Sequence, residues 1–170
     1  LRNLMKPFEQ AKCSVYLLHG DMTTEQLTGL YTHPKVKALI NLSHGEGYGL
    51  PMFEAAYNAL PVIAPAWSGQ KDFLYAPKKG KNKKAHMAPH FAQAEYSIQP
   101  IQQEAHWPGV LNPDQMWCFP HNGSYKNALR KMRKDYGTYK SLAKKLKVYV
   151  EKNFTEEKMY QKFADAVFKE

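Results

Sequence analysis

Short apolar runs alternate with amphipathic segments along the first part of the chain. Residues 14–18 and 36–42 are two such runs, and residues 62–65 form a third one. Runs of this kind are typical of parallel strands that are buried on both faces. The segments between them suit helices, so strands and helices alternate. This order predicts an α/β fold with a Rossmann-like parallel sheet, right-handed crossovers and flanking helices.

Local signals predict where the helices of this part begin and end. Thr23 and Gln26 form a possible capping box for a helix that ends at His33. Residues 51–60 are good helix formers apart from Asn58. The helix can begin with proline, because the missing N–H is not needed at the first helical position. Residues 66–75 suggest a loop and one further helix.

The last part of the chain, from Ser124 onward, has helical periodicity. Gly137 is expected to separate two of its helices. Thr155 is a good N-cap for the last helix, which carries Phe163 and Val167 on one apolar face. We expect part of that face to lack a partner within the chain.

The segment between these parts carries several prolines and Gly80, which break any long element. Only residues 95–100 suggest a short edge strand. We therefore expect one partial domain with three parts: an α/β core over residues 13–75, an irregular insertion over residues 76–123, and terminal helices over residues 124–170.

Three glycines alternate in the loop that follows the second apolar run: Gly45, Gly47 and Gly49. Glycine tolerates positive φ and lets a ligand approach the backbone closely. The loop leads directly into the predicted helix, so backbone N–H groups and the positive end of that helix point at one place. Such an arrangement predicts an anion site.

Two carboxylates frame this glycine loop. Glu46 lies inside it, and Glu54 follows eight positions later, where we expect the first turn of the helix. A carboxylate suits a vicinal diol, and a hydrogen bond to a charged group contributes about 1.5–3 kcal/mol. An anion site between two diol-binding groups fits a nucleotide sugar. The dinucleotide-binding fingerprint does not fit, because Leu50 occupies its third glycine position.

Residues 46–54 (Glu-Gly-Tyr-Gly-Leu-Pro-Met-Phe-Glu) resemble the E-x7-E signature of retaining GT-B glycosyltransferases, the group that includes sucrose and glycogen synthases. The similarity continues through residues 61–64 and 68–72. The family usually has glutamate where Asp72 stands, and often a second glycine at Gln70. The resemblance covers the α/β core well and the terminal helices loosely.

The resemblance implies transfer of a sugar from a UDP- or GDP-linked donor to an unknown acceptor, with retention of configuration. Glu46 would be the catalytic residue that holds the donor sugar, and Glu54 would bind the ribose diol. The other expected donor-binding residues are Gly20, Gly47, Tyr48, Gly49, Leu50 and Ser68. A simple helix cap is an equal alternative for Ser68. No cofactor and no metal ion are implied.

The resembled enzymes also contain an N-terminal acceptor domain and a strand–helix–strand unit that supplies an Arg and a Lys to the pyrophosphate. Nothing in residues 1–12, which could form a short helix, matches that unit. We therefore expect a donor-binding domain truncated at its start and inactive alone. The missing acceptor domain is its implied partner.

The net charge of +9 calls for an anionic partner or surface. The excess lies mainly in residues 78–84 and 126–147. Peripheral contact with an anionic surface is one possibility, whereas nucleic acid is not expected, because no reading motif is recognisable. Cys13 and Cys118 are too few for a disulfide framework, and there is no signal peptide at the start, so a cytoplasmic location is predicted.

Two other hypotheses stay open beside the enzyme, and one of them is a basic nucleic-acid-binding domain, which rests on charge alone. The main alternative is a nucleotide-sugar or anion-binding module without chemistry. Histidines between residues 86 and 121, together with Cys118, suggest a zinc site, but their spacing is looser than that of structural zinc sites.

Overall fold

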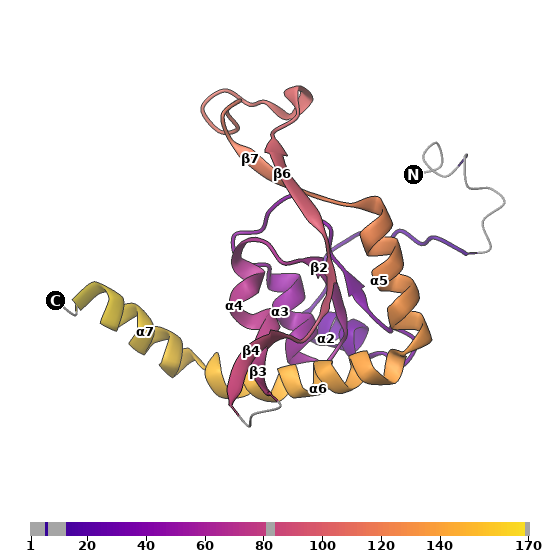
Figure 1. Cartoon of the computed structure of the whole chain (residues 1–170), viewed down its shortest axis with the longest axis vertical. Helices are drawn as coiled ribbons and strands as arrows, with labels where there is room; N and C mark the ends of the chain where they lie inside the picture. The colour runs from indigo at the N-terminus through magenta and orange to yellow at the C-terminus, as the bar shows by residue number, and fades with distance from the viewer. Residues whose placement is uncertain (1–5, 7–12, 81–83, 169–170) are drawn as a thin grey trace.

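The computed structural model describes residues 6, 13–80 and 84–168 of the chain. The helix predicted over residues 1–12 therefore lies outside the described residues. Within them the fold is α/β, with a small parallel sheet, two antiparallel strand pairs and six α-helices (Figure 1). No helix in the described ranges is both long and apolar enough to cross a membrane.

The elements follow one another in this order: α2 Thr24–Thr32, β1 Leu39–Ile40, α3 Leu50–Tyr57, β2 Val62–Pro65, the 3-10 helix η2 Ser68–Gln70, α4 Lys71–Leu74, β3 Tyr75–Lys79, β4 Ala85–Pro89, β5 Ala92–Ala94, β6 Tyr96–Pro100, the 3-10 helix η3 Gln103–Ala105, β7 Met116–Pro120, α5 Asn122–Lys134, α6 Tyr136–Asn153 and α7 Glu156–Phe168.

The parallel sheet has the strand order β1-β2-β5. Every residue of the central strand β2 is buried, as expected of an apolar run that is covered on both faces. The bounds of β2 agree with the prediction. The run at 36–42 gives only the two-residue strand β1, although Asn41 continues the pairing by donating its backbone N–H to the carbonyl oxygen of Ile63 at 3.0 Å.

The strand predicted at residues 14–18 does not form. These residues have no regular structure, and Tyr16 and Leu17 are 88% and 69% exposed. A run that is apolar on both faces needs a covering layer on each face. All five side chains are exposed, so this run is not covered on either face by the described residues.

The start of α2 agrees with the prediction. Thr23 and Gln26 form the capping box, with each side chain bonded to the other residue's backbone N–H, and His33 is the C-cap. Helix α3 ends three residues before the predicted end. Asn58 donates from its side chain to the carbonyl oxygen of Glu54 at 2.9 Å, and Ala59 follows with a φ of 53°. This left-handed residue ends the helix.

The break between α5 and α6 lies at Asp135, not at Gly137 as predicted. The carboxylate of Asp135 accepts from the backbone N–H of Thr138, so it caps α6, and Gly137 becomes the second residue of that helix. Helix α7 has no buried residue, and Phe163 is 68% exposed. This exposure confirms that the apolar face of the last helix lacks a partner here.

The segment expected to be irregular carries five strands. β3 and β4 form one antiparallel pair, β5 completes the parallel sheet, and β6 pairs with β7 in a hairpin that projects from the body (Figure 1). The hairpin is attached to the glycine loop: the backbone N–H of Cys118 donates to the carbonyl oxygen of His44 at 3.0 Å. The ring of His44 stacks on Trp117 with centroids 4.9 Å apart.

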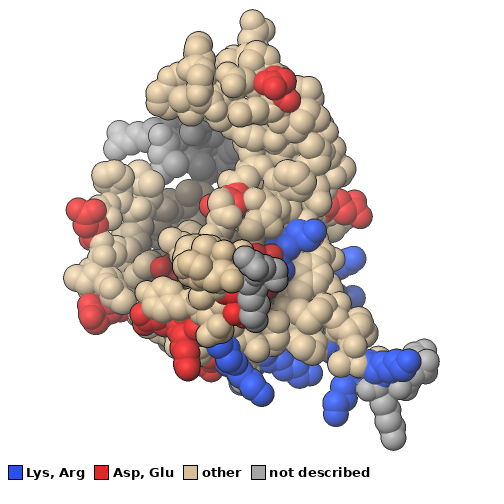
Figure 2. Space-filling view, turned by 90° about the vertical axis from the view of Figure 1, so that its left-hand side faces the viewer, with Lys and Arg blue, Asp and Glu red and all other residues tan. Residues whose placement is uncertain are grey.

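One hydrophobic core joins α3, β2, α4 and α6. Met52, Phe73 and Leu146 are among its most buried members. The core fixes α3 against the sheet and α6, and thereby fixes the start of α3, where the glycine loop ends. Charged side chains are unevenly distributed over the face shown in Figure 2: Lys and Arg gather toward its lower right, whereas Asp and Glu occupy its lower left.

Candidate functional site

Two loops meet at the carboxyl edge of the parallel sheet. β1 and β2 run parallel, residues 43–49 follow β1, and residues 66–70 follow β2. Ligands of open α/β sheets bind outside the carboxyl ends of the strands. Of the residues predicted for the site, Glu46, Gly47, Tyr48, Gly49 and Ser68 lie in these two loops.

The two loops touch through Ser68 and Gly69. The Ser68 hydroxyl donates to the carbonyl oxygen of Glu46, and Ser68 has a φ of 64°. A Cβ on Gly69 would lie only 2.2 Å from the carbonyl oxygen of Gly47 and 2.8 Å from Cα of Tyr48. Ser68 therefore ties the loops together rather than capping a helix, and only glycine fits at position 69.

Gly49 forms the junction between the glycine loop and α3. Its φ of 88° is left-handed, and its carbonyl oxygen accepts from the N–H groups of Met52 and Phe53. Within the described ranges, the N–H groups of Gly47, Tyr48 and Gly49 donate to no protein acceptor. In the first turn of α3 only Leu50 adds a free N–H group, because Pro51 has none and those of Met52 and Phe53 are bonded to Gly49. The free N–H groups of residues 47–50 favour an anion.

The carboxylate of Glu46 is held at one oxygen. Oε1 accepts from Nδ2 of Asn41 at 3.0 Å and from the hydroxyl of Ser43 at 2.9 Å. Oε2 accepts no hydrogen bond from the described residues, and the side chain is half-buried. The arrangement fixes the carboxylate and leaves one oxygen able to accept from a ligand hydroxyl.

Glu54 lies in a groove between α2 and α3 with a volume of about 390 Å³. The residues that line it are Met22, Thr24, Leu27, Thr28, Tyr31, Phe53, Glu54, Tyr57 and Asn58. Glu54 is the fifth residue of α3, so the expectation that it lies in the first turn was wrong. The helix begins one residue earlier than predicted, at Leu50, because Gly49 rather than Leu50 takes the cap position.

Tyr31, one of the two tyrosines that line this groove, is hydrogen-bonded to Glu54. Burial, followed by the hydrogen bond to Glu54 and its negative charge, raises the pKa of Tyr31 to about 12. A neutral Tyr31 hydroxyl therefore donates to the carboxylate at physiological pH. A ribose diol would have to share or replace this donor.

The groove at Glu54 is lined by neither Glu46 nor the glycine loop. Aromatic packing lies between them: the Tyr48 ring contacts Phe53 and Phe73, with centroids 5.6 Å and 5.2 Å apart. The residues predicted for one site therefore lie in two places, which we call half-sites: the glycine loop with Glu46, and the groove at Glu54. Tyr48 anchors the loop, and burial followed by the charge of Asp72 raises its pKa.

The other predicted residues have fewer contacts. Leu50 is 61% exposed at the start of α3. Gly20 is exposed with a φ of 129°, and a Cβ added to it would meet no atom within 4 Å, so it touches neither half-site directly. Its turn still reaches the groove at Glu54, because Met22 lines that groove.

Sequence reasoning missed Gln70. The side chain is 2% exposed, and its Nε2 donates to the carbonyl oxygen of Pro65 at 3.1 Å, while Oε1 has no partner among the described residues. Its Cβ lies 3.6 Å from where a Cβ on Gly49 would be. A buried acceptor thus lies beneath the glycine loop. The departure from the family's glycine at this position was the available signal.

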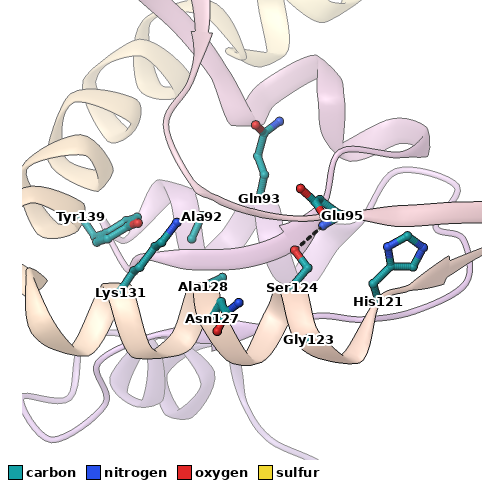
Figure 3. A pocket seen from close by; sticks show the side chains of 10 residues that line it. All are labelled: Ala92, Gln93, Glu95, His121, Gly123, Ser124, Asn127, Ala128, Lys131 and Tyr139. Atoms are coloured by element: carbon teal, nitrogen blue, oxygen red, sulfur yellow. Dashed lines mark hydrogen bonds between the residues drawn. The ribbon is translucent and has the colours of Figure 1, made fainter.

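A larger cavity, of about 640 Å³, lies between β5 and α5 (Figure 3). Its polar residues include Glu95, His121 and Lys131, and the backbone N–H of Glu95 donates to the Ser124 hydroxyl at 2.8 Å. None of the residues predicted for the site lines it. In the described part of the chain, no three His, Cys, Asp or Glu side chains are placed to hold a metal ion.

The raised pKa of Tyr31 predicts that the protein loses stability at alkaline pH. Unfolded tyrosine ionises near pH 10, whereas Tyr31 in the folded protein ionises near 12. The stabilisation is complete below the unfolded pKa and is lost as the pH rises through the folded pKa. Between about pH 10 and 12, urea unfolding should show a smaller loss of stability for Tyr31→Phe than for the unchanged protein. Equal losses of stability in the two proteins would show that folding does not shift the pKa of Tyr31.

Comparison of the chain with known protein families, with curated proteins and with solved structures found no match.

Proposed function

We propose that this chain forms the donor side of a retaining glycosyltransferase, with a Rossmann-like sheet of the GT-B kind. The observation that supports this best is the fixed carboxylate of Glu46 beside the unpaired N–H groups of the glycine loop. A carboxylate that can bind hydroxyls thus lies beside N–H groups that attract negative charge. Sugar and diphosphate adjoin in the same way in a nucleoside diphosphate sugar.

The aromatic cluster between the half-sites counts against this proposal, and a ligand that used both would have to extend over Tyr48, Phe53 and Phe73. The diphosphate would lie at the N–H groups of Gly47 to Gly49 and at the start of α3. The donor sugar would extend toward Oε2 of Glu46, and the ribose toward Glu54 in the groove. The base would then lie near the turn that contains Met22, which lines the same groove.

The chemical step needs stabilisation of the leaving diphosphate. Negative charge develops on it as the bond to the sugar breaks, and prearranged N–H donors stabilise that charge without reorganisation. Glu46 would hold the sugar hydroxyls and orient the anomeric carbon. The acceptor would attack on the face from which the diphosphate departs, so that the configuration is retained.

A binding module without chemistry is the second candidate. It is favoured by one observation: no Lys or Arg lines the groove at Glu54 or bonds to the glycine loop in the described residues. The two candidates differ in one assay. Incubation of the full-length protein, with its acceptor domain, with radiolabelled UDP- or GDP-sugars yields free or transferred sugar if it is an enzyme. Binding without either product identifies the module.

Replacing Glu54 with glutamine should weaken donor binding about tenfold or more. The change keeps the side chain's size but removes the charge from a hydrogen bond to the ribose, and bonds to charged groups contribute about 1.5–3 kcal/mol. Calorimetric titration with UDP- and GDP-sugars would measure the affinity. Glu95→Gln removes the same charge at the cavity between β5 and α5 and should leave affinity unchanged. Equal affinities of the Glu54 variant and the unchanged protein would exclude Glu54 from the site.

A further inference from the structure

Two helices account for the whole excess of positive charge. Together α5 and α6 contain ten of the 24 Lys and Arg residues and one of the 15 Asp and Glu residues. The remainder of the chain therefore holds fourteen residues of each sign, and the excess of nine belongs to these helices. The lysines of the β3–β4 hairpin, by contrast, are balanced by acids elsewhere.

Six of the cations follow one path across the surface, which we name the cationic ridge: Lys37, Lys126, Arg130, Arg133, Lys140 and Lys144. On α5, Lys126, Arg130 and Arg133 recur at the spacing of one helix face. Lys37, just before β1, lines one groove with Arg133 and a second groove with Lys140. Lys144 follows one turn after Lys140 on α6.

Among the described residues, no Asp or Glu lines either of the two grooves at the ridge. Burial, followed by the charges of Lys144 and Lys37, lowers the pKa of Lys140, so these ammonium groups lie close enough to repel one another. Lys140 itself donates to the carbonyl oxygen of Ala59 at 2.8 Å. Mutually repelling cations oppose folding, and an anionic partner would relieve that repulsion.

The first groove adds an apolar surface between the cations. It has a volume of about 370 Å³ and is lined by Ala38, Leu129, Met132 and Tyr136 between Lys37 and Arg133. Leu129 is 45% exposed, on the same face of α5 as the cations. The phosphates of a nucleic acid would contact the cations but leave the apolar lining of this groove exposed to water. The headgroup region of a bilayer presents phosphates and, just beneath them, hydrocarbon.

We propose that the cationic ridge docks this protein on a bilayer rich in anionic phospholipid, with Leu129 and the apolar groove at the acyl boundary. The proposal does not depend on sugar transfer. Lys37 precedes β1, whereas the glycine loop follows it, so the two lie toward opposite ends of the strand. Docking through the ridge therefore leaves the glycine loop open to solution.

Vesicle binding tests the proposal on the whole chain. The protein should sediment with vesicles that contain phosphatidylglycerol, weakly or not at all with pure phosphatidylcholine vesicles, and less as salt is added. A cation near an anionic bilayer raises partitioning about fivefold. The triple variant Lys37→Gln, Arg130→Gln, Arg133→Gln should therefore bind roughly 100-fold more weakly. These side chains are exposed, and circular dichroism would verify the fold.

A matched control separates the ridge from net charge. The variant Lys78→Gln, Lys79→Gln, Lys84→Gln removes three exposed cations from the β3–β4 hairpin and should lose little affinity. Equal losses in the two triple variants would overturn the proposal, as would equal binding to neutral vesicles. Leu129→Ser should weaken vesicle binding several-fold. Unchanged binding by that variant, or ridge-dependent binding of an RNA duplex in preference to vesicles, would exclude the bilayer as the partner.

Discussion

Replacing Glu46 with glutamine is expected to lower kcat for sugar transfer by about 100-fold or more, which is typical of removing one electrostatic contact made in the transition state. Glutamine keeps an oxygen that can accept from Asn41 and Ser43, so the loop should keep its shape. What disappears is the negative charge on the oxygen that faces the ligand. The loss should appear in kcat more than in KM, because the charge acts on the reacting sugar.

Steady-state rates of the complete enzyme with a UDP- or GDP-sugar donor would measure the effect of the Glu46 variant. Glu95→Gln again serves as the control, since it removes one exposed carboxylate away from the glycine loop. Thermal unfolding would show that both variants fold. Near-normal turnover of the Glu46 variant would remove this residue from the catalytic site and leave the binding module as the better hypothesis.

The sequence predicted those structures that a short segment determines by itself. The capping box depends on Thr23 and Gln26, which are three residues apart, and it is present. The strand at residues 62–65 depends on burial of four consecutive apolar residues, and it too is present. The glycine loop and residues 66–70 meet at the carboxyl edge of the sheet because each directly follows a parallel strand.

Structures that depend on distant segments could not be predicted. The strand expected at residues 14–18 fails for lack of a covering layer, which no local pattern reveals. The hydrogen bond between His44 and the carbonyl oxygen of Cys118 joins residues 74 positions apart. Both residues belong to segments whose sequence has neither helical nor strand periodicity. Deep burial of Gln70 is likewise set by the loop above it.

The candidate site likewise combines features that nearby residues determine with features that distant segments determine. Asn41 and Ser43 orient Glu46 from nearby in the chain, so the polar residues after the strand carried that information. The aromatic cluster that separates Glu46 from Glu54 depends on Phe73, which lies on another helix. Spacing alone therefore suggested one crevice, whereas tertiary packing makes two half-sites.

A single methyl group at Gly69 should disrupt both the fold and the candidate site. A Cβ there would lie 2.2 Å from the carbonyl oxygen of Gly47, and the obstacle is backbone, which cannot turn aside as a side chain can. Overpacking of this kind costs about 1–3 kcal/mol, occasionally more. Gly69→Ala should therefore lower the free energy of unfolding by that amount in urea, and should also displace the N–H groups of Gly47 to Gly49. Donor affinity should fall with it.

The alanine variant at Gly29 provides the contrast. Gly29 lies within α2, and a Cβ there would have no atom within 4 Å, so Gly29→Ala should stabilise the protein by up to about 1 kcal/mol through helix propensity. The two variants make the same chemical change in opposite surroundings. If Gly69→Ala proved as stable as Gly29→Ala and bound donor equally well, the two loops would not be in contact. The glycine loop would then lack the support on which the proposed anion site depends.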